Sequence, residues 1–327
     1  PRDFINSHQL IVGLVAMYLG FFIAAPEIVA PAFQRHPEGA PSLWPFLFIT
    51  IACGAISGFH GLVSSGTTSK QLNKIGDACS IGCGSMLGEG ILALMAILAC
   101  TAGFATFEAW QSHYASWGAA QGLAAKLSAF IQGTGSFIQT LGIPQGLAEA
   151  VVVVIIISFA ATTLDTATRI QRIVLGELGE SIPGTQGTRL FNNRFFGSGV
   201  AVVSSFILLV AADEGKGGLI LWPLFGATNQ LIAVLGLAAV TYWLIKKKAP
   251  SVYTALPLMF LSLIVIWAIG SNTLDYYQEE NKLLFWTQVI ILGMVVWFTV
   301  EWVRGLIKGT PIVEPVGEAQ SLQRENS

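Results

Sequence analysis

The sequence has little charge. Asp, Glu, Lys and Arg make up only 11% of the 327 residues, and the formal net charge at pH 7 is −2. A soluble domain usually has about a quarter of its residues charged, so this deficit indicates long segments that water does not solvate. The near-neutral balance, without a basic patch of interleaved aromatic residues, gives no reason to expect nucleic acid as a partner.

The chain also lacks a cysteine framework and the short motifs of enzymes. Its four cysteines lie in or beside apolar segments, and Cys79 and Cys83 have no histidine near them in sequence. We therefore expect small apolar packing for the cysteines and no bound metal. No phosphate-binding loop, G-x-S-x-G nucleophile or H-E-x-x-H zinc motif occurs. We expect no enzyme and no cofactor, and any pumping would have to use an ion gradient.

What the chain does contain is a series of long apolar segments. Hydrophobic residues make up 53% of it, and a helix that spans a bilayer needs about 20 mostly apolar residues. Eight segments reach or approach that length, so we predict an all-α membrane protein, a polytopic bundle of about eight transmembrane helices with some of them discontinuous. The segments are Ile11–Val29, Leu43–Val63, Ile81–Phe104, Leu147–Thr163, Gly197–Ala212, Leu219–Ile245, Val252–Gly270 and Leu283–Val303.

The positive charges predict an orientation. If the chain starts in the cytoplasm and crosses eight times, most lysine and arginine residues fall on the cytoplasmic side, as the positive-inside rule requires. Both ends of the chain are then cytoplasmic. The far side would hold only Arg35, Lys126, Lys216 and Lys282.

The remaining stretches are expected to be connections. Thr106–Pro144 is predicted to be a long external connection, within which Gln121–Leu141 could form an amphipathic surface helix. Glu177–Arg194 is predicted to be a polar cytoplasmic loop. We expect one transmembrane domain over residues 1–308 and a disordered cytoplasmic tail over 309–327, which is polar and poor in apolar residues. Because no initiator methionine is present, we interpret the chain as the C-terminal part of a longer protein.

The most informative segment is Cys53–Lys70, CGAISGFHGLVSSGTTSK. Its Gly, Ser and Thr residues predict an interrupted helix, because irregular backbone at membrane depth survives only where protein or a water-filled cavity satisfies it. Transporters hold solutes at such interruptions. Histidine normally titrates near pH 6.5, so His60 could carry a coupling proton, or it could be a neutral structural histidine. Ser64, Ser65 and Thr67 could line a solute path or could cap a helix end.

Polar residues also occur in, or directly after, three other predicted spans. Glu89, between two glycines, is a second candidate for proton coupling or a structural hydrogen bond between helices. Asp165 and Arg169 are four residues apart and could form an inner gate, although an ion pair that fixes a helix end is the simpler interpretation. Asn229 and Gln230 point about 100° apart, so one could bond a neighbouring helix while the other faces a cavity.

Three blocks together resemble the carbon starvation protein A (CstA) family of bacterial inner-membrane transporters. They are PFLFITIACGAISGFHGLVSSGTTSK at Pro45–Lys70, LWPLFGATNQ at Leu221–Gln230 and LDTATR at Leu164–Arg169. The resemblance implies a secondary transporter related in architecture to half of an amino acid–polyamine–organocation transporter. It also implies uptake of peptides or pyruvate during carbon starvation, driven by protons, with sodium left open as the coupling ion. The family's N-terminal half, a partner of this segment in any solute site, is absent from this sequence.

The resemblance implies candidate lining residues, and two other functional classes stay open. A passive channel or facilitator could use the same polar lining, and a membrane sensor of nutrients could signal through the tail. The lining candidates are His60, Ser64, Ser65, Thr67, Glu89, Asp165, Arg169, Asn229 and Gln230.

Overall fold

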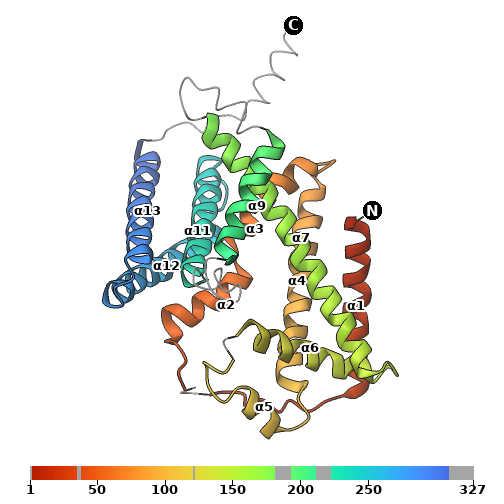
Figure 1. Cartoon of the computed structure of the whole chain (residues 1–327). Coiled ribbons are helices and arrows are strands. Elements are labelled where there is room, and N and C mark those ends of the chain that lie inside the picture. Colours follow the sequence, from red (N-terminus) through yellow and green to blue (C-terminus); the bar gives the residue numbers. More distant parts are fainter. Residues whose placement is uncertain (1, 35–37, 121, 181–192, 211–221, 309–327) are drawn as a thin grey trace. The chain divides into compact units, whose positions relative to one another are not determined.

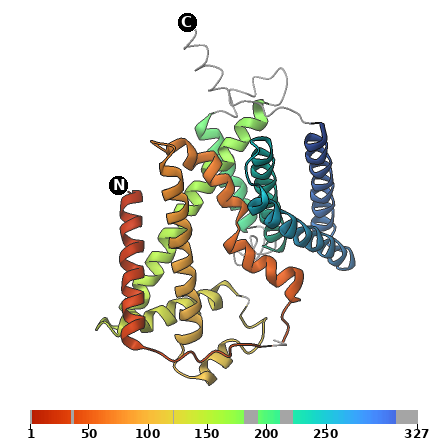
Figure 2. The same cartoon turned by 180° about the vertical axis from the view of Figure 1, so that it is seen from behind.

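The computed structural model describes residues 2–34, 38–120, 122–180, 193–210 and 222–308, and these residues form helices and connecting segments without a strand (Figures 1 and 2). They divide into two compact units, each of which is described by itself. Unit 1 comprises Pro1–Pro41 and Thr67–Val203, and unit 2 comprises Ser42–Gly66 and Ser204–Ser327. The predicted single domain over residues 1–308 stays a prediction, and the predicted tail lies outside the described residues.

The expectation of a polytopic helical membrane protein is confirmed. The fifth predicted span is a shorter apolar helix of 17 residues, α9 (Arg194–Val210), and residues 219–221 of the sixth lie outside the described part. Seven helical segments in the described part are long and apolar enough to cross a bilayer. They are Phe4–Ala24, Leu43–Gln71, Asp77–Ala102, Gln145–Gly179, Leu224–Lys246, Val252–Gln278 and Lys282–Lys308.

Unit 1 is built around α6 (Leu123–Gln139), which packs against α1 (Arg2–Ala24), α4 (Asp77–Ala102) and α7 (Gln145–Glu180). Each of the four helices contributes apolar side chains to one buried cluster, so α6 is the centre of this unit. The cluster includes Met17, Met95, Ala99, Phe137 and Val152.

This position of α6 corrects the sequence analysis. The prediction of a surface helix at Gln121–Leu141 is wrong, because α6 lies within this stretch and is a core element of unit 1. The external position of Thr106–Pro144 stays a prediction. A Cβ atom at Gly133 would collide with the backbone carbonyl of Ala99, so the glycine allows α6 to lie directly against α4. The buried Thr134 hydroxyl donates to the Phe130 carbonyl at 2.6 Å. Polar residues that suggested a wet surface are thus satisfied inside their own helix.

Helix α7 is also longer than predicted. It runs for 36 residues, well beyond the predicted span Leu147–Thr163. The polar loop predicted at Glu177–Arg194 therefore begins as helix, and residues 181–192 of it lie outside the described part. Along it, Thr162, Thr166 and Thr168 each donate a side-chain hydrogen bond to the carbonyl four residues earlier, so their hydroxyls have partners within the helix. The loss of apolar character marks the end of the hydrophobic part, not the end of the helix.

The described part of unit 2 includes three long helices and two short ones that pack on them. The long helices α11 (Trp222–Lys246), α12 (Val252–Gln278) and α13 (Lys282–Lys308) pack against one another, and the short helices α2 (Phe48–Ala55) and α3 (Gly58–Val63) pack on α11. Unit 2 therefore joins the interrupted segment to a bundle of three long helices. The core of the bundle contains Ala227, Leu261, Val265, Ile269 and Val295.

Candidate functional site

The predicted interruption lies between α2 and α3. Helix α2 ends at Ala55, and the chain leaves helical geometry at Ile56 (φ −131°, ψ 73°) and Ser57 (φ −86°, ψ 123°) before α3 begins at Gly58. The last backbone carbonyls of a helix have no hydrogen-bond partner inside that helix, and neither do the first N–H groups of the next one. The segment predicted to be discontinuous is thus confirmed as discontinuous, inside a candidate membrane span.

The side chain of Asn229 on α11 holds this interruption together. Its Oδ1 accepts a hydrogen bond from the Phe59 N–H at 2.8 Å, and its Nδ2 donates to Ser57 Oγ at 3.3 Å and to Cys53 Sγ at 3.1 Å. One amide therefore contacts the last turns of α2, the break itself and the first turn of α3. Ser57 occupies the N-cap position of α3 without forming a side-chain cap, and Asn229 supplies the cap from another helix.

Gly58 makes this arrangement possible. A Cβ atom at Gly58 would collide with the Asn229 carbonyl oxygen and lie only 2.6 Å from the Ala233 nitrogen. Only glycine lets α3 cross α11 this closely, and Asn229 can then reach the Phe59 N–H. Gly54, four residues earlier in α2, has no atom within 4 Å of its Cβ position in the described structure.

The polar residues after the break differ in their surroundings. His60 is exposed, and no hydrogen-bond partner for its ring occurs among the described residues. Ser64 and Ser65 are exposed, and both hydroxyls donate to the Gly61 carbonyl at 2.9 Å. They belong to a π-helical turn, η2 (Ser64–Thr68), in which Thr67 is buried. Short π-helical segments often occur at functional sites.

Glu89 lies in unit 1, on the exposed first half of α4. Neither Gly88 nor Gly90 has a described atom within 4 Å of its Cβ position, so space beside this carboxylate is open in the described structure. His60 belongs to unit 2.

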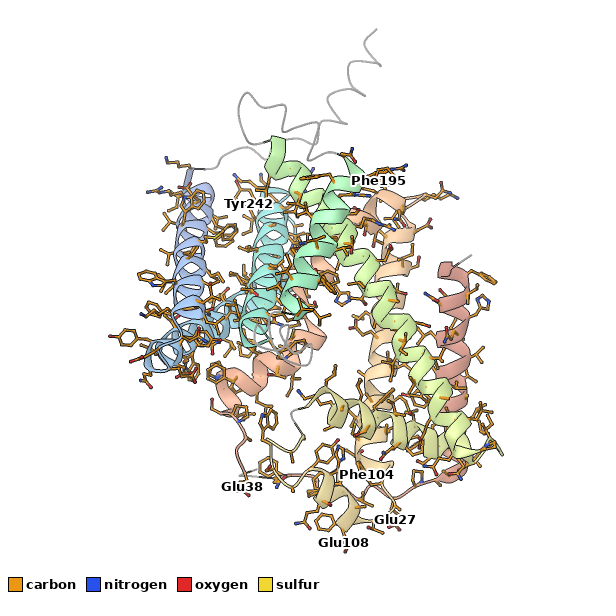
Figure 3. The ribbon with its side chains drawn as sticks, viewed as in Figure 1. Glu27, Glu38, Phe104, Glu108, Phe195 and Tyr242 are labelled. Atoms are coloured by element: carbon orange, nitrogen blue, oxygen red, sulfur yellow. The ribbon has the colours of Figure 1, made fainter. Side chains whose placement is uncertain are left out.

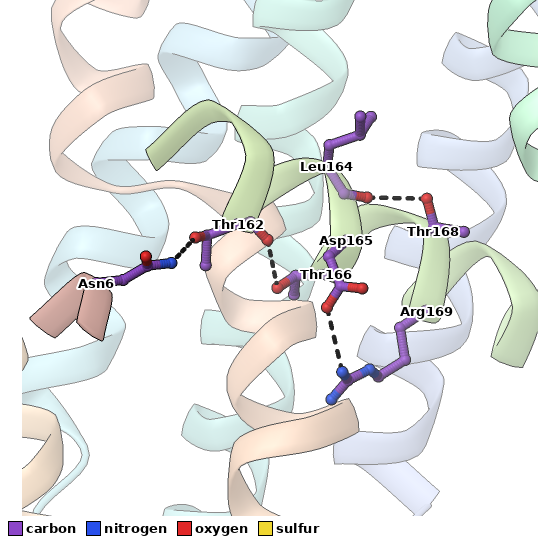
Figure 4. Close-up of polar contacts among 7 residues, drawn as sticks. All are labelled: Asn6, Thr162, Leu164, Asp165, Thr166, Thr168 and Arg169. Atoms are coloured by element: carbon purple, nitrogen blue, oxygen red, sulfur yellow. Dashed lines mark hydrogen bonds and ion pairs between the residues drawn. The ribbon is translucent and has the colours of Figure 1, made fainter. Parts of the chain in front are cut away.

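Asp165 and Arg169 form an ion pair on α7, shown in Figure 4. Arg169 Nη2 lies 3.2 Å from Asp165 Oδ2, and each side chain is 41% exposed. Nearby, Asn6 of α1 donates to the Thr162 hydroxyl at 2.9 Å, which joins the two helices. Because α7 continues to Glu180, the pair lies within a helix and not at its end, which corrects the expected position.

Gln230 and a second glutamine are the least expected features of unit 2. Gln230 is fully buried, and neither its Oε1 nor its Nε2 has a hydrogen-bond partner among the described residues. Gln288 on α13 is in the same condition. Sequence analysis identified Gln230 but missed Gln288, although a single amide in an otherwise apolar stretch of α13 was a usable signal.

Over most of its length the chain is similar to known proteins of one family. The model of the family described as "Carbon starvation protein CstA" matches residues 1–127 and 104–268. The chain is 32% identical to the peptide transporter CstA of Bacillus subtilis, over 87% of this chain and 51% of the relative. No solved structure gives a significant match.

Two Escherichia coli proteins are similar at the same level. The pyruvate/proton symporter BtsT is 30% identical over 83% of this chain and 47% of its own length. The peptide transporter CstA is 30% identical over 76% of this chain and 42% of its own length. The chain thus spans about half the length of the curated relatives it matches.

Proposed function

Because the chain belongs to the carbon starvation protein CstA family, we propose that it forms part of a secondary active transporter in the bacterial inner membrane. Its solutes are peptides or pyruvate-like small carboxylates. The observation that carries this proposal is the interrupted helix at Ile56–Ser57, held by Asn229 inside a candidate span. Secondary transporters place solute and ion sites at such interruptions.

The relatives support the choice of solutes. Two of those described above are named peptide transporters, and one is named a pyruvate/proton symporter. In this chain, the hydroxyls of Ser64, Ser65 and Thr67 follow the interruption and are candidate solute contacts. Asn229 is a positioning residue, because its amide is engaged with the two half-helices.

His60 and Glu89 are the candidate proton carriers. Both side chains are exposed in the described structure, and both lie in candidate membrane spans, where ionisable side chains mark proton pathways. We propose protons as the coupling ion because one relative is named a pyruvate/proton symporter. Sodium coupling is the alternative that the experiment below separates.

The distribution of charge in unit 1 supports the proposed orientation. Figure 3 shows Glu27, Glu38 and Glu108 at one end of this unit, and all three are exposed. Lys70 and Lys74 precede the opposite end of α4. The lysine end of unit 1 is assigned to the cytoplasm by the positive-inside rule. With the eight crossings predicted from the sequence, both ends of the chain are assigned to that side.

The solute site is shared with a further part of the protein. The relatives are about twice as long as the segment they share with this chain. We assign the remainder to an N-terminal half that completes the solute site beside α2 and α3. Transporters of this kind bind their solutes between two such halves.

The test uses the intact protein in proteoliposomes with labelled pyruvate and a panel of dipeptides. An inward proton gradient should drive accumulation above equilibrium, and an uncoupler should abolish it. A sodium gradient in place of the proton gradient serves as the matched comparison. Uptake that stops at equilibrium and ignores the uncoupler would contradict active transport and support a passive facilitator.

A further inference from the structure

Three polar groups in the bundle of unit 2 have unfilled hydrogen-bonding capacity. They are the amides of Gln230 on α11 and Gln288 on α13, both 0% exposed, and the hydroxyl of Tyr276 on α12, whose side chain is 7% exposed. All are without a hydrogen-bond partner among the described residues. Buried polar atoms in folded proteins nearly always have a partner, so three in one small bundle require an explanation.

The two amides enter the same apolar cluster from different helices. Gln230 lies between Ala227 and Val234 on one face of α11, and both of these residues belong to the cluster. Gln288 lies one helical turn before Ile291 and Leu292, which pack against the same cluster from α13. Helix geometry therefore aims both side chains into the space between α11, α12 and α13.

The hairpin of α12 and α13 adds Asn272 and Tyr276 to this region. The two helices are antiparallel neighbours joined by a short turn near residue 280. Asn272 and Gln288 each lie about eight residues from the centre of that turn, so they are level with each other. Tyr276 lies one turn closer to the end of the hairpin, where Glu279 is exposed. Polar groups thus extend from the exposed turn into the bundle.

The unfilled groups define the chemistry of what fills them. Each amide offers an unfilled donor, Nε2, and an unfilled acceptor, Oε1. A metal cation would engage only the acceptor, and a carboxylate would engage only the donor. A water molecule donates and accepts, and so does the hydroxyl of Tyr276. Buried waters typically make about three hydrogen bonds to groups of this kind.

The neighbouring cavity does not compete for these waters. A cavity of about 310 Å³ lies between α11, α12 and α13, and Val234 and Val295 form part of its wall. Its hydroxyl groups, on Ser262 and Thr299, already donate to carbonyls of their own helices at 2.6 and 2.8 Å. The unsatisfied polar capacity of the bundle is therefore concentrated at the two amides and the Tyr276 hydroxyl.

We propose that Gln230, Gln288 and Tyr276 form an internal hydration site, in which bound water molecules connect the turn between α12 and α13 to the middle of α11. Gln230 directly follows Asn229, so the bound waters nearest Gln230 lie beside α11, the helix whose Asn229 caps α3. Resting on the proposed transport function, the site then supplies hydrated access for the coupling proton toward the interrupted helix.

The first experiment detects the water directly. X-ray hydroxyl-radical footprinting of the intact protein in ¹⁸O-labelled water oxidises side chains beside bound water, and mass spectrometry reports the sites. We compare wild type with Gln288→Leu, which keeps the size of the side chain and removes its polar atoms. Gln278→Leu, the same change at an exposed position on α12, is the matched control.

We expect oxidation of Tyr276, Ile291 and Leu292 in wild type, and a several-fold loss of it in Gln288→Leu but not in Gln278→Leu. Equal labelling in all three proteins would overturn the proposal, as would a structure of the intact protein with a protein side chain bonded to both amides. Gln230→Leu repeats the test if Gln288→Leu does not fold, which thermal unfolding in detergent reports.

Transport provides the second readout and separates the two proposals. Proton-driven uptake by Gln288→Leu should be slower than that of wild type, with an unchanged KM for the solute. Loss of labelling with unchanged uptake would retain the hydration site and overturn its role in proton access. Absence of uptake in wild type would contradict the transport function, while the footprint alone would still decide whether the site is hydrated.

Discussion

Asn229 on α11 caps the first turn of α3 by accepting a hydrogen bond from the Phe59 N–H at 2.8 Å, across 170 residues of sequence. The amide is 3% exposed, so water does not replace the bond if it is lost. Its Nδ2 at the same time donates to Ser57 and Cys53. The geometry of the interrupted helix therefore depends on one side chain from a different helix.

Replacing Asn229 by leucine should destabilise unit 2 and impair uptake. The substitution keeps the approximate volume but leaves the partly buried Phe59 N–H without its acceptor, which costs up to about 1–3 kcal/mol. Thermal unfolding in detergent and solute uptake by proteoliposomes measure the two effects. Thr228→Val is the control, because the Thr228 hydroxyl bonds only carbonyls of its own helix. If the two variants behave alike, Asn229 is not the cap of α3.

Gly58→Ala should damage the same site from the other side. The new Cβ would collide with the Asn229 carbonyl and push α3 away from α11, and overpacking of this kind costs about 1–3 kcal/mol. Gly54→Ala has open space and lies within α2, so it should gain up to about 1 kcal/mol from higher helix propensity. Opposite shifts of the unfolding temperature are expected. Shifts of the same sign and size would contradict the close crossing.

The interruption could be predicted from sequence because its cause is local. The run of glycine and hydroxyl residues after Cys53 opposes a continuous helix wherever it lies in space. The partner of the interruption could not be predicted in the same way, because Asn229 is distant in sequence and two interpretations of its amide were open. Asn229 bonds to Phe59 because α3 crosses α11 closely at Gly58. This crossing is a tertiary contact, which the local sequence pattern does not show.

The error about α6 has a related cause. Amphipathic character and polar residues such as Thr134 suggested a surface helix, and hydropathy does not show which polar groups bond within their own helix. Nor does it show that Gly133 lies against the Ala99 carbonyl, which requires knowledge of the neighbouring helix. The length of the apolar segments in the sequence therefore identified most candidate spans. The core position of α6 became clear only from its contacts with neighbouring helices.

Gly133→Ala provides a direct check on the core position of α6. Its Cβ would meet the backbone of α4 within the core of unit 1, so we expect a loss of about 1–3 kcal/mol and a lower unfolding temperature. Gly146→Ala, in the first turn of α7 with open space around it, should leave the unfolding temperature unchanged or slightly raised. If Gly133→Ala leaves the unfolding temperature unchanged, the core position of α6 is contradicted and its assignment as a surface helix is favoured.

His60→Gln should abolish proton-driven accumulation while the protein remains folded in the membrane. Glutamine keeps hydrogen-bonding capacity but cannot take up a proton, so coupling is lost without loss of a polar side chain. Glu89→Gln tests the second candidate in the same assay. His8→Gln is the control, because His8 bonds only the Phe4 carbonyl of its own helix. Accumulation by both His60→Gln and Glu89→Gln with the pH dependence of wild type would remove these residues from the coupling mechanism.

The ion pair of Asp165 and Arg169 allows a structural role to be separated from a gating role. Both side chains are 41% exposed and lie four residues apart on α7, and such pairs contribute about 0.5 kcal/mol or less to stability. Asp165→Asn and Arg169→Gln should therefore barely change the unfolding temperature. Glu301→Gln, which breaks a comparable exposed pair with Arg304 on α13, gives the reference for a pair without a gating role. A gate makes and breaks its contact during each cycle, so loss of uptake beyond the Glu301→Gln reference would assign gating to the pair. Uptake equal to that reference would leave the pair as a surface contact of α7.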